Sequence, residues 1–316
     1  MVTSGMQQSV QKRTLVPVYR TAWTVPTDTR IDLGGSISFE SVENLLKPES
    51  FELWRQYVSE DARKSLSAVR FALVHRFSSS AHVGPAEQKS VELMQRVFVC
   101  LRLIKPTKAI WSNIQFRDTP EGIDVFSFTH PTERIAATPE AEAFNEIDLY
   151  DIRRLQQLLD AFLELVDNGP LNVRSAIRHY ELGYSEVQDD VLQFVTWMMA
   201  LEQFYSSGED PVPPDELMRK ISDYVDIDQD IYAETQFREV FPALPAITAR
   251  EALPNLFILR NRFVHGLWVQ KEWLAPARIG TLYEKTSYAD VLREVVSWLV
   301  RKSLVNYLET TSSARR

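Results

Sequence analysis

The second half of the chain contains long stretches in which apolar residues recur at steps of three and four. This spacing places apolar side chains along one face of an α-helix. Glu146–Val166 has a wide stripe of this kind, and Gly169-Pro170 is expected to end that helix. Val187–Tyr205 is apolar almost all round, which predicts a helix at the centre of a bundle. Residues 141–316 are therefore predicted to form an all-helical domain.

Four further helices are predicted in this domain from the same spacing. A proline in the first helical turn needs no partner for an N–H, so Pro254 is expected to begin one of them. Gly183 is expected to end another, since glycine readily adopts the conformations that stop a helix. The predicted bounds are 172–182, 214–224, 254–265 and 288–308.

Residues 1–140 are predicted to form a smaller α+β region. Ala109–Arg117 and Ile123–Thr129 alternate apolar and polar residues on either side of a turn sequence, which predicts a β-hairpin. Leu15–Val25 is rich in residues that favour strands but contains a proline, so we expect an edge strand or an irregular extended segment. The overall fold class is mainly α, with this region preceding the helical domain.

Two helices are also expected in the first region. Pro48 is predicted to begin a helix that runs to about Phe77, because its apolar residues keep helical steps. Val91–Ile104 favours a helix, although a buried strand fits the same apolar run. Pro131–Glu140 contains two prolines and small residues and is the expected boundary between the two domains.

Composition excludes several classes of site. The net charge is -8, so a nucleic-acid site would have to be a local basic patch, for which the stretch 250–278 is the candidate. Cys100 is the only cysteine, and the other histidines outside 259–266 share no metal-ligand spacing and are expected on the surface or a helix face. We expect no metal, no cofactor, no membrane segment and a cytoplasmic location.

The stretch Leu259–Gly266 holds the densest group of reactive side chains. On a helix, Asn261 and His265 are four residues apart and share a face, and the long side chain of Arg260 can reach the same groove. Gly266 is expected to end the helix just after the histidine. An always-charged guanidinium, an amide and a titratable imidazole are therefore predicted to converge at one helix end.

This octet resembles the motif of the HEPN superfamily, an arginine, a polar residue, a short gap and a histidine, and is most similar to the Apea-like branch. Met199–Glu202 resembles the family's apolar-Ala-Leu-Glu helix, and Asn172–Tyr180 resembles the helix before it. The likeness covers only the second half of the chain. It implies a metal-independent endoribonuclease acting in phage defence or toxin-like growth arrest, and a homodimer in which two motifs form a composite site on RNA.

The resemblance also implies a role for each residue of the motif. His265 would be the general base or acid, and Arg260 would hold the scissile phosphate and stabilise its added charge. Asn261 would orient the histidine or a phosphate oxygen, and Arg262 would bind the RNA backbone. Glu202 is expected to form an ion pair with Arg260 or another structural contact, in preference to a catalytic role.

Two other interpretations of the motif remain open. One is a catalytically silent HEPN module that binds RNA, a nucleotide or a protein partner. The other is a purely structural helix end, in which Arg260 pairs with an acid and His265 caps a carbonyl. Chemistry at His265 distinguishes the first from an enzyme, and the stability of an Arg260 variant tests the second.

Overall fold

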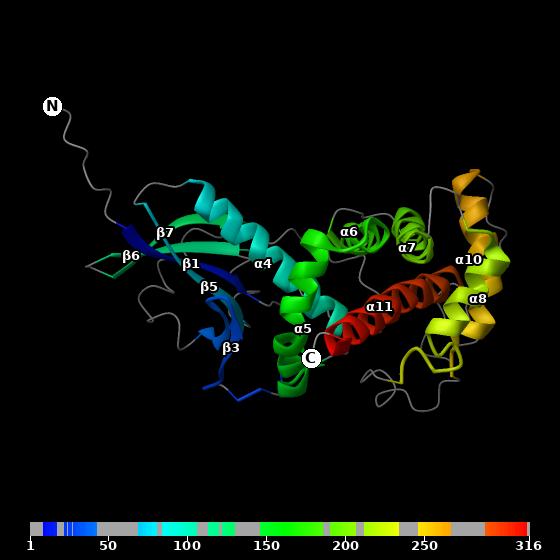
Figure 1. Ribbon diagram of the computed structural model, residues 1–316, viewed down its shortest axis with the longest axis horizontal. Helices are drawn as coiled ribbons and strands as arrows, with labels where there is room; N and C mark the ends of the chain where they lie inside the picture. Colours follow the sequence, from blue (N-terminus) through cyan, green and yellow to red (C-terminus); the bar gives the residue numbers. More distant parts are fainter. Residues whose placement is uncertain are drawn as a thin grey trace. The chain divides into compact units, whose positions relative to one another are not determined.

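The computed structural model describes residues 9–17, 22–23, 25–26, 28–42, 69–80, 84–105, 113–119, 122–129, 146–185, 190–206, 212–233, 246–266 and 288–314. These residues form two compact units (Figure 1). The first contains the described residues up to 129 together with Glu146–Asp160, and the second contains those from Ala161 onward. The described part is mainly helical with an antiparallel sheet in its first unit, which confirms the predicted class in this coarse form.

The first unit is built on a six-stranded sheet in the order β3-β4-β5-β1-β6-β7, and every neighbouring pair is antiparallel. A second sheet pairs β2 and β8 in parallel. The predicted hairpin is confirmed as β6 and β7. The strands are β1 (Ser9–Pro17), β2 (Ala22–Trp23), β3 (Arg30–Gly34), β4 (Ile37–Ser41), β5 (Phe71–Ser80), β6 (Asn113–Thr119), β7 (Gly122–Thr129) and β8 (Glu146–Ile147).

The predictions for two segments of this unit need correction. Leu15–Pro17 belongs to β1, an inner strand paired with β5 and β6, because Pro17 is its last residue and leaves the earlier N–H groups available for pairing. Ala22–Trp23 of the same predicted segment forms β2 in the two-stranded sheet, and residues 18–21 and 24 lie outside the described residues. The predicted helix to Phe77 is replaced at its end by β5. There Phe71 to Val74 are all fully buried, and an apolar run covered on both faces of a sheet has no period that distinguishes it from a buried helix. Residues 48–68 of that predicted helix, like the expected boundary at 131–140, lie outside the described residues.

Helix α4 (Pro85–Ile104) confirms the helical interpretation of Val91–Ile104, although it begins six residues earlier than predicted. Pro85 occupies the first turn, and the carboxylate of Glu87 accepts a hydrogen bond from the backbone N–H of Gly84 at 2.7 Å. The helix packs against β1 and β5. Its start is therefore fixed by a capping interaction.

A buried polar layer joins α4 to the sheet. Lys12 of β1 forms an ion pair with Glu87, and the two side chains are 1% and 2% exposed. The hydroxyl of Ser90 donates to Thr14 at 2.7 Å, and its oxygen lies 2.7 Å from Nδ1 of His75. His75 was expected on the surface or a helix face, but it lies half-buried on β5, where burial lowers the pKa of its imidazole.

We expect Glu87→Gln to lower the free energy of unfolding by about 3–5 kcal/mol, because it removes the buried negative charge that pairs with the Lys12 ammonium. Burial opposes ionisation of Glu87, but hydrogen bonds from Lys12, Ser79 and the backbone together lower its pKa from 4.5 to about 2. A depressed carboxyl pKa stabilises the fold above 4.5, and this contribution is lost as the pH falls from 4.5 toward 2.

Urea denaturation of wild type and Glu87→Gln between neutral and acid pH measures both effects. The exposed Glu92→Gln on the same helix is the matched control and should change stability little. A Glu87→Gln protein as stable as this control at neutral pH would contradict the prediction.

The second unit is a bundle of helices around α7. In Figure 1, α7 lies between α6 and α10, and α11 runs across beside them. Trp197, Leu201 and Phe194 of α7 are almost completely buried, so its predicted central position is confirmed. The helices are α5 (Leu149–Asn168, shared with the first unit), α6 (Leu171–Ser185), α7 (Asp190–Tyr205), α8 (Pro214–Tyr224), α10 (Ala249–Val264) and α11 (Tyr288–Ala314).

Two predicted helix ends in this unit were wrong for tertiary reasons. α6 continues past Gly183 to Ser185. The glycine serves the packing of two helices and does not end one, since its missing side chain leaves room for the Trp197 indole. A Cβ atom at position 183 would lie 2.3 Å from Nε1 of Trp197. α10 begins at Ala249 and contains Pro254. Its first turn is fixed by the preceding segment, since the N–H of Arg250 donates to the carbonyl of Ile227 at 3.0 Å.

Candidate functional site

The helix that carries the motif is anchored to α7 by its apolar face. Leu256 and Leu259 are fully buried, and the ring of Phe263 meets that of Phe194 on α7 edge to face at 5.7 Å between centroids. These positions on α10 follow each other at steps of three and four, so they form one stripe. The opposite face of the helix, which contains Asn261 and His265, is exposed.

The end of α10 follows the sequence prediction. The N–H of His265 donates to the carbonyl of Asn261 at 3.1 Å, which is the contact of residues one helical turn apart. Gly266 then adopts a left-handed conformation with φ of 63° and donates to the carbonyl of Phe263 at 3.1 Å. Asn261 and His265 therefore occupy the same exposed face, and the imidazole stands at the helix terminus.

Arg260 is held from two sides. Its Nη2 lies 3.2 Å from Oε2 of Glu202 on α7, and its Nη1 donates to Oδ1 of Asn261 at 3.1 Å. The side chains of Arg260 and Glu202 are 31% and 30% exposed. The expected ion pair is thus present, and it joins α10 to α7. A guanidinium has five N–H donors, and only these two contacts form with the described residues, so the group retains capacity for phosphate oxygens.

Arg262 takes a different position from the other motif residues. It is half-buried on α10 and interacts within the chain. The basic excess of 250–278 is also partly neutralised, because the guanidinium of Arg250 binds Asp228 of the preceding acidic stretch, with Nη2 and Oδ2 2.8 Å apart. Residues 267–278 of the candidate basic patch lie outside the described residues.

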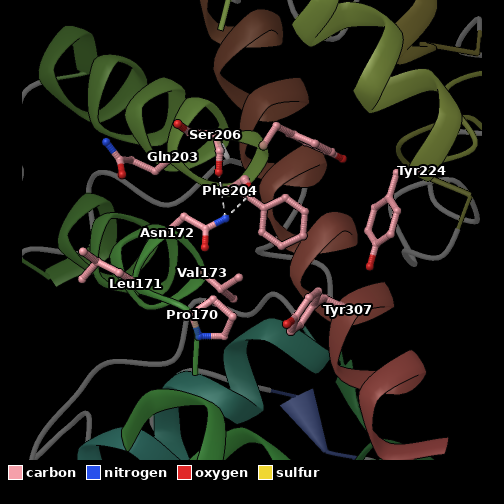
Figure 2. Close-up of a pocket in the computed structure, with 10 residues that line it drawn as sticks. Pro170, Leu171, Asn172, Val173, Gln203, Phe204, Ser206, Tyr224 and Tyr307 are labelled. Carbon is pink, nitrogen blue, oxygen red and sulfur yellow. Dashed lines mark hydrogen bonds between the residues drawn. The ribbon is translucent and has the colours of Figure 1, made fainter. Parts of the chain in front are cut away.

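Sequence reasoning missed an aromatic pocket in the same unit (Figure 2). Its lining comes from the first turn of α6 and the residue before it, the last turn of α7 and the residue after it, the end of α8 and the second half of α11. Tyr205, Tyr224 and Tyr307 are its tyrosines. The sequence signal was weak, because residues near helix ends contribute little to an apolar stripe. The pocket becomes evident only when four helices are brought together.

The residues that the structure describes contain no group of three or more His, Cys, Asp or Glu side chains arranged to hold a metal ion. Among the described helices, none offers the length of apolar sequence that spanning a lipid bilayer takes. Burial raises the pKa of the Cys100 thiol, which makes it a poor nucleophile.

None of the three comparisons, with protein-family models, curated proteins and solved structures, gives a match. Interpretation of the site therefore depends on its own geometry. That geometry brings Arg260, Asn261 and Glu202 into contact and places His265 on the face of Asn261.

We expect Arg260→Ala to lower the free energy of unfolding by less than about 1 kcal/mol, since a pair that is one-third exposed gains little from its charge interaction. Thermal and urea unfolding measure this change. Arg219→Ala, which removes an exposed pair with Asp223 on α8, is the matched control. A loss of several kcal/mol for Arg260→Ala alone would assign the motif to the structural helix end.

Proposed function

We propose that the protein is an endoribonuclease of the HEPN type whose site is formed by Arg260, Asn261 and His265. The observation that carries the proposal is the joint placement of these groups. An oriented, partly exposed guanidinium lies beside an exposed amide, and an exposed imidazole follows one turn later at the helix end. This set supplies both a phosphate-binding group and a proton-transfer group.

The proposed reaction needs no metal ion. The 2′-oxygen of a ribose bonds to the adjacent phosphorus while the bond from phosphorus to the 5′-oxygen breaks. A base removes the proton of the 2′-hydroxyl, and a proton is delivered to the leaving 5′-oxygen. The products are a 2′,3′-cyclic phosphate and a free 5′-hydroxyl. In this scheme His265 transfers a proton, and Arg260 stabilises the charge that develops on the phosphoryl oxygens.

Glu202 has a positioning role in the proposal. Its carboxylate fixes one edge of the Arg260 guanidinium from α7, which leaves the other N–H groups to meet a phosphate. Asn261 bonds Arg260 and lies one turn before His265, so it can orient either group. Arg262 is assigned to the RNA backbone, as the family resemblance implies.

We expect induction of the protein in a bacterial host to arrest growth and fragment RNA, and we expect His265→Ala to abolish both. Loss of a positioned proton-transfer group costs about 10²–10⁴-fold in rate. The exposed position of His265 should leave the fold unchanged. Growth curves and total RNA, with end-group analysis for cyclic phosphate, give the readout.

His179→Ala is the control for this experiment, since its imidazole Nδ1 lies 2.9 Å from the carbonyl of Ser175 within α6, away from the motif. It should behave as wild type. Fragmentation that persists in His265→Ala would refute the assignment of the catalytic residue.

A catalytically silent binding module is the second candidate, and one observation favours it. Among the described residues, none makes a hydrogen bond to the His265 imidazole, so no contact there orients the ring for the proton transfer that catalysis needs. Under this interpretation neither wild type nor His265→Ala would cut RNA. The histidine variant would then only weaken the affinity for a bound RNA, nucleotide or protein.

We further propose that two copies of the chain meet at the exposed face of α7 and α10. Ile258, 44% exposed, lies on the same face of α10 as Asn261 and His265. Leu192 and Met199 lie two turns apart on α7 and are 59% and 41% exposed. Apolar side chains beside a polar site are typical of an interface, and covering them would bring two motifs together.

We expect wild type to be a dimer in light scattering and Ile258→Glu to be a monomer with little cleavage activity, because a charge would be buried in the interface. Tyr150→Glu, at a position 70% exposed on α5, is the control and should remain dimeric. A wild-type monomer that cleaves RNA would contradict the composite site.

A further inference from the structure

The aromatic pocket of the second unit has a cavity volume of about 650 Å³. Figure 2 shows the rings of Phe204, Tyr224 and Tyr307 on one side, and on the other Val173 of α6 and Pro170, which precedes that helix. The rings pack on one another, with centroids 5.8 Å apart for Phe204 and Tyr224 and 6.0 Å apart for Phe204 and Tyr307. They form a continuous aromatic wall, and a ligand would lie against it.

The three tyrosine hydroxyls of the pocket differ in their hydrogen bonds. The hydroxyl of Tyr205 lies 2.8 Å from Oγ of Ser303. Those of Tyr224 and Tyr307 form no hydrogen bond with any residue that the structure describes. Burial, and then the proximity of Tyr307, raises the pKa of Tyr224 to about 12, so its hydroxyl remains a donor at neutral pH. The wall therefore presents two hydroxyl donors toward a ligand.

Asn172 adds a fixed acceptor on the other side. Its amide nitrogen donates to the carbonyls of Phe204 and Ser206 at 3.0 and 3.1 Å, which uses both N–H groups and holds the side chain in one orientation. Its Oδ1 accepts no hydrogen bond from the described residues. A ligand N–H would satisfy this oxygen.

The charge of the pocket restricts its ligands. The ten described residues that line it include no Asp, Glu, Lys, Arg or His. Lys220 is close to the pocket, but its ammonium donates to the carbonyl of Tyr205 at 3.2 Å and pairs with Glu216 at 3.0 Å. An anionic ligand would therefore lose its hydration without gaining a counter-ion.

We propose that this pocket binds a proline-rich segment of another polypeptide in the polyproline II conformation. Such a segment has no internal hydrogen bonds, so its carbonyls need donors, which Tyr224 and Tyr307 supply. Its rare N–H groups need acceptors, which Asn172 supplies. Its pyrrolidine rings pack on aromatic side chains, as in other aromatic-lined grooves that recognise this conformation. A bound α-helix would leave the hydroxyls unmatched, since its own carbonyls are already paired.

The test is a titration of the full chain against a fluorescein-labelled peptide of repeated Ala-Pro-Pro units, followed by fluorescence anisotropy. We expect saturable binding, and at least about tenfold weaker binding of an equally long peptide of Ala-Gly-Gly units, which must lose backbone freedom to bind. Absence of binding at millimolar peptide, or equal binding of the two peptides, would overturn the proposal.

Substitutions in the aromatic wall test whether the peptide binds in this pocket. Tyr307→Ala removes a ring and should weaken binding about tenfold, whereas Tyr307→Phe keeps the ring and should cost about fivefold, the value of one hydrogen bond. Tyr224→Phe combined with Tyr307→Phe retains the packing surface and tests both hydroxyls if the alanine variant unfolds. Unchanged affinity in the double variant and in every folded Tyr307 variant would place the peptide elsewhere and refute the assignment.

Peptide binding in this pocket does not depend on the proposed endoribonuclease site. Arg260→Ala should bind the peptide as wild type does, because its guanidinium contacts Glu202 and Asn261 and does not line the pocket. A single-stranded oligoadenylate that displaces the peptide from wild type, and that binds Tyr307→Ala more weakly, would overturn the peptide assignment in favour of RNA.

Discussion

The close packing of α6 on α7 is the constraint on which the second unit depends. Trp197 lies directly on Gly183, and its indole N–H donates to the carbonyl of Tyr180 at 3.1 Å. The amide of Gln193 donates to the carbonyl of Gly183 at 2.7 Å, so the same short segment of α6 binds α7 twice. These contacts fix both the separation and the rotation of α7, because an indole in van der Waals contact with backbone tolerates no side chain between them.

The rotation of α7 determines what its last turn presents to its surroundings. Glu202 faces α10 and binds Arg260, whereas Phe204 and Tyr205 line the aromatic pocket. Successive residues of one helical turn thus serve two sites with different chemistry, one charged and one neutral. A shift of α7 against α6 would disturb both. Their geometry therefore rests on the Gly183–Trp197 contact, although neither residue belongs to either site.

The sequence predicted those features that depend on local pattern. The β6–β7 hairpin, the core helix α7 and the stop at Gly266 each follow from period or turn chemistry within a few residues. The errors arose where a tertiary contact decides. The sequence alone predicts a helix stop at Gly183, because the contact with Trp197 is tertiary. It predicts a helix over β5 because Phe71–Val74 is buried on both faces of the sheet. The aromatic pocket had no local signal, since its tyrosines come from different helices.

Glu202 has two opposing effects on the motif. Its carboxylate orients Arg260, and it also competes with a phosphate for the guanidinium. A carboxylate that fixes the guanidinium lowers the entropy lost when a phosphate binds, but it also lowers the potential that attracts the phosphate. An enzyme benefits from the first effect, since orientation of a charge that stabilises the transition state contributes directly to rate. A binding module gains less from orientation and loses more from the reduced charge. The ion pair is therefore better suited to catalysis than to affinity alone.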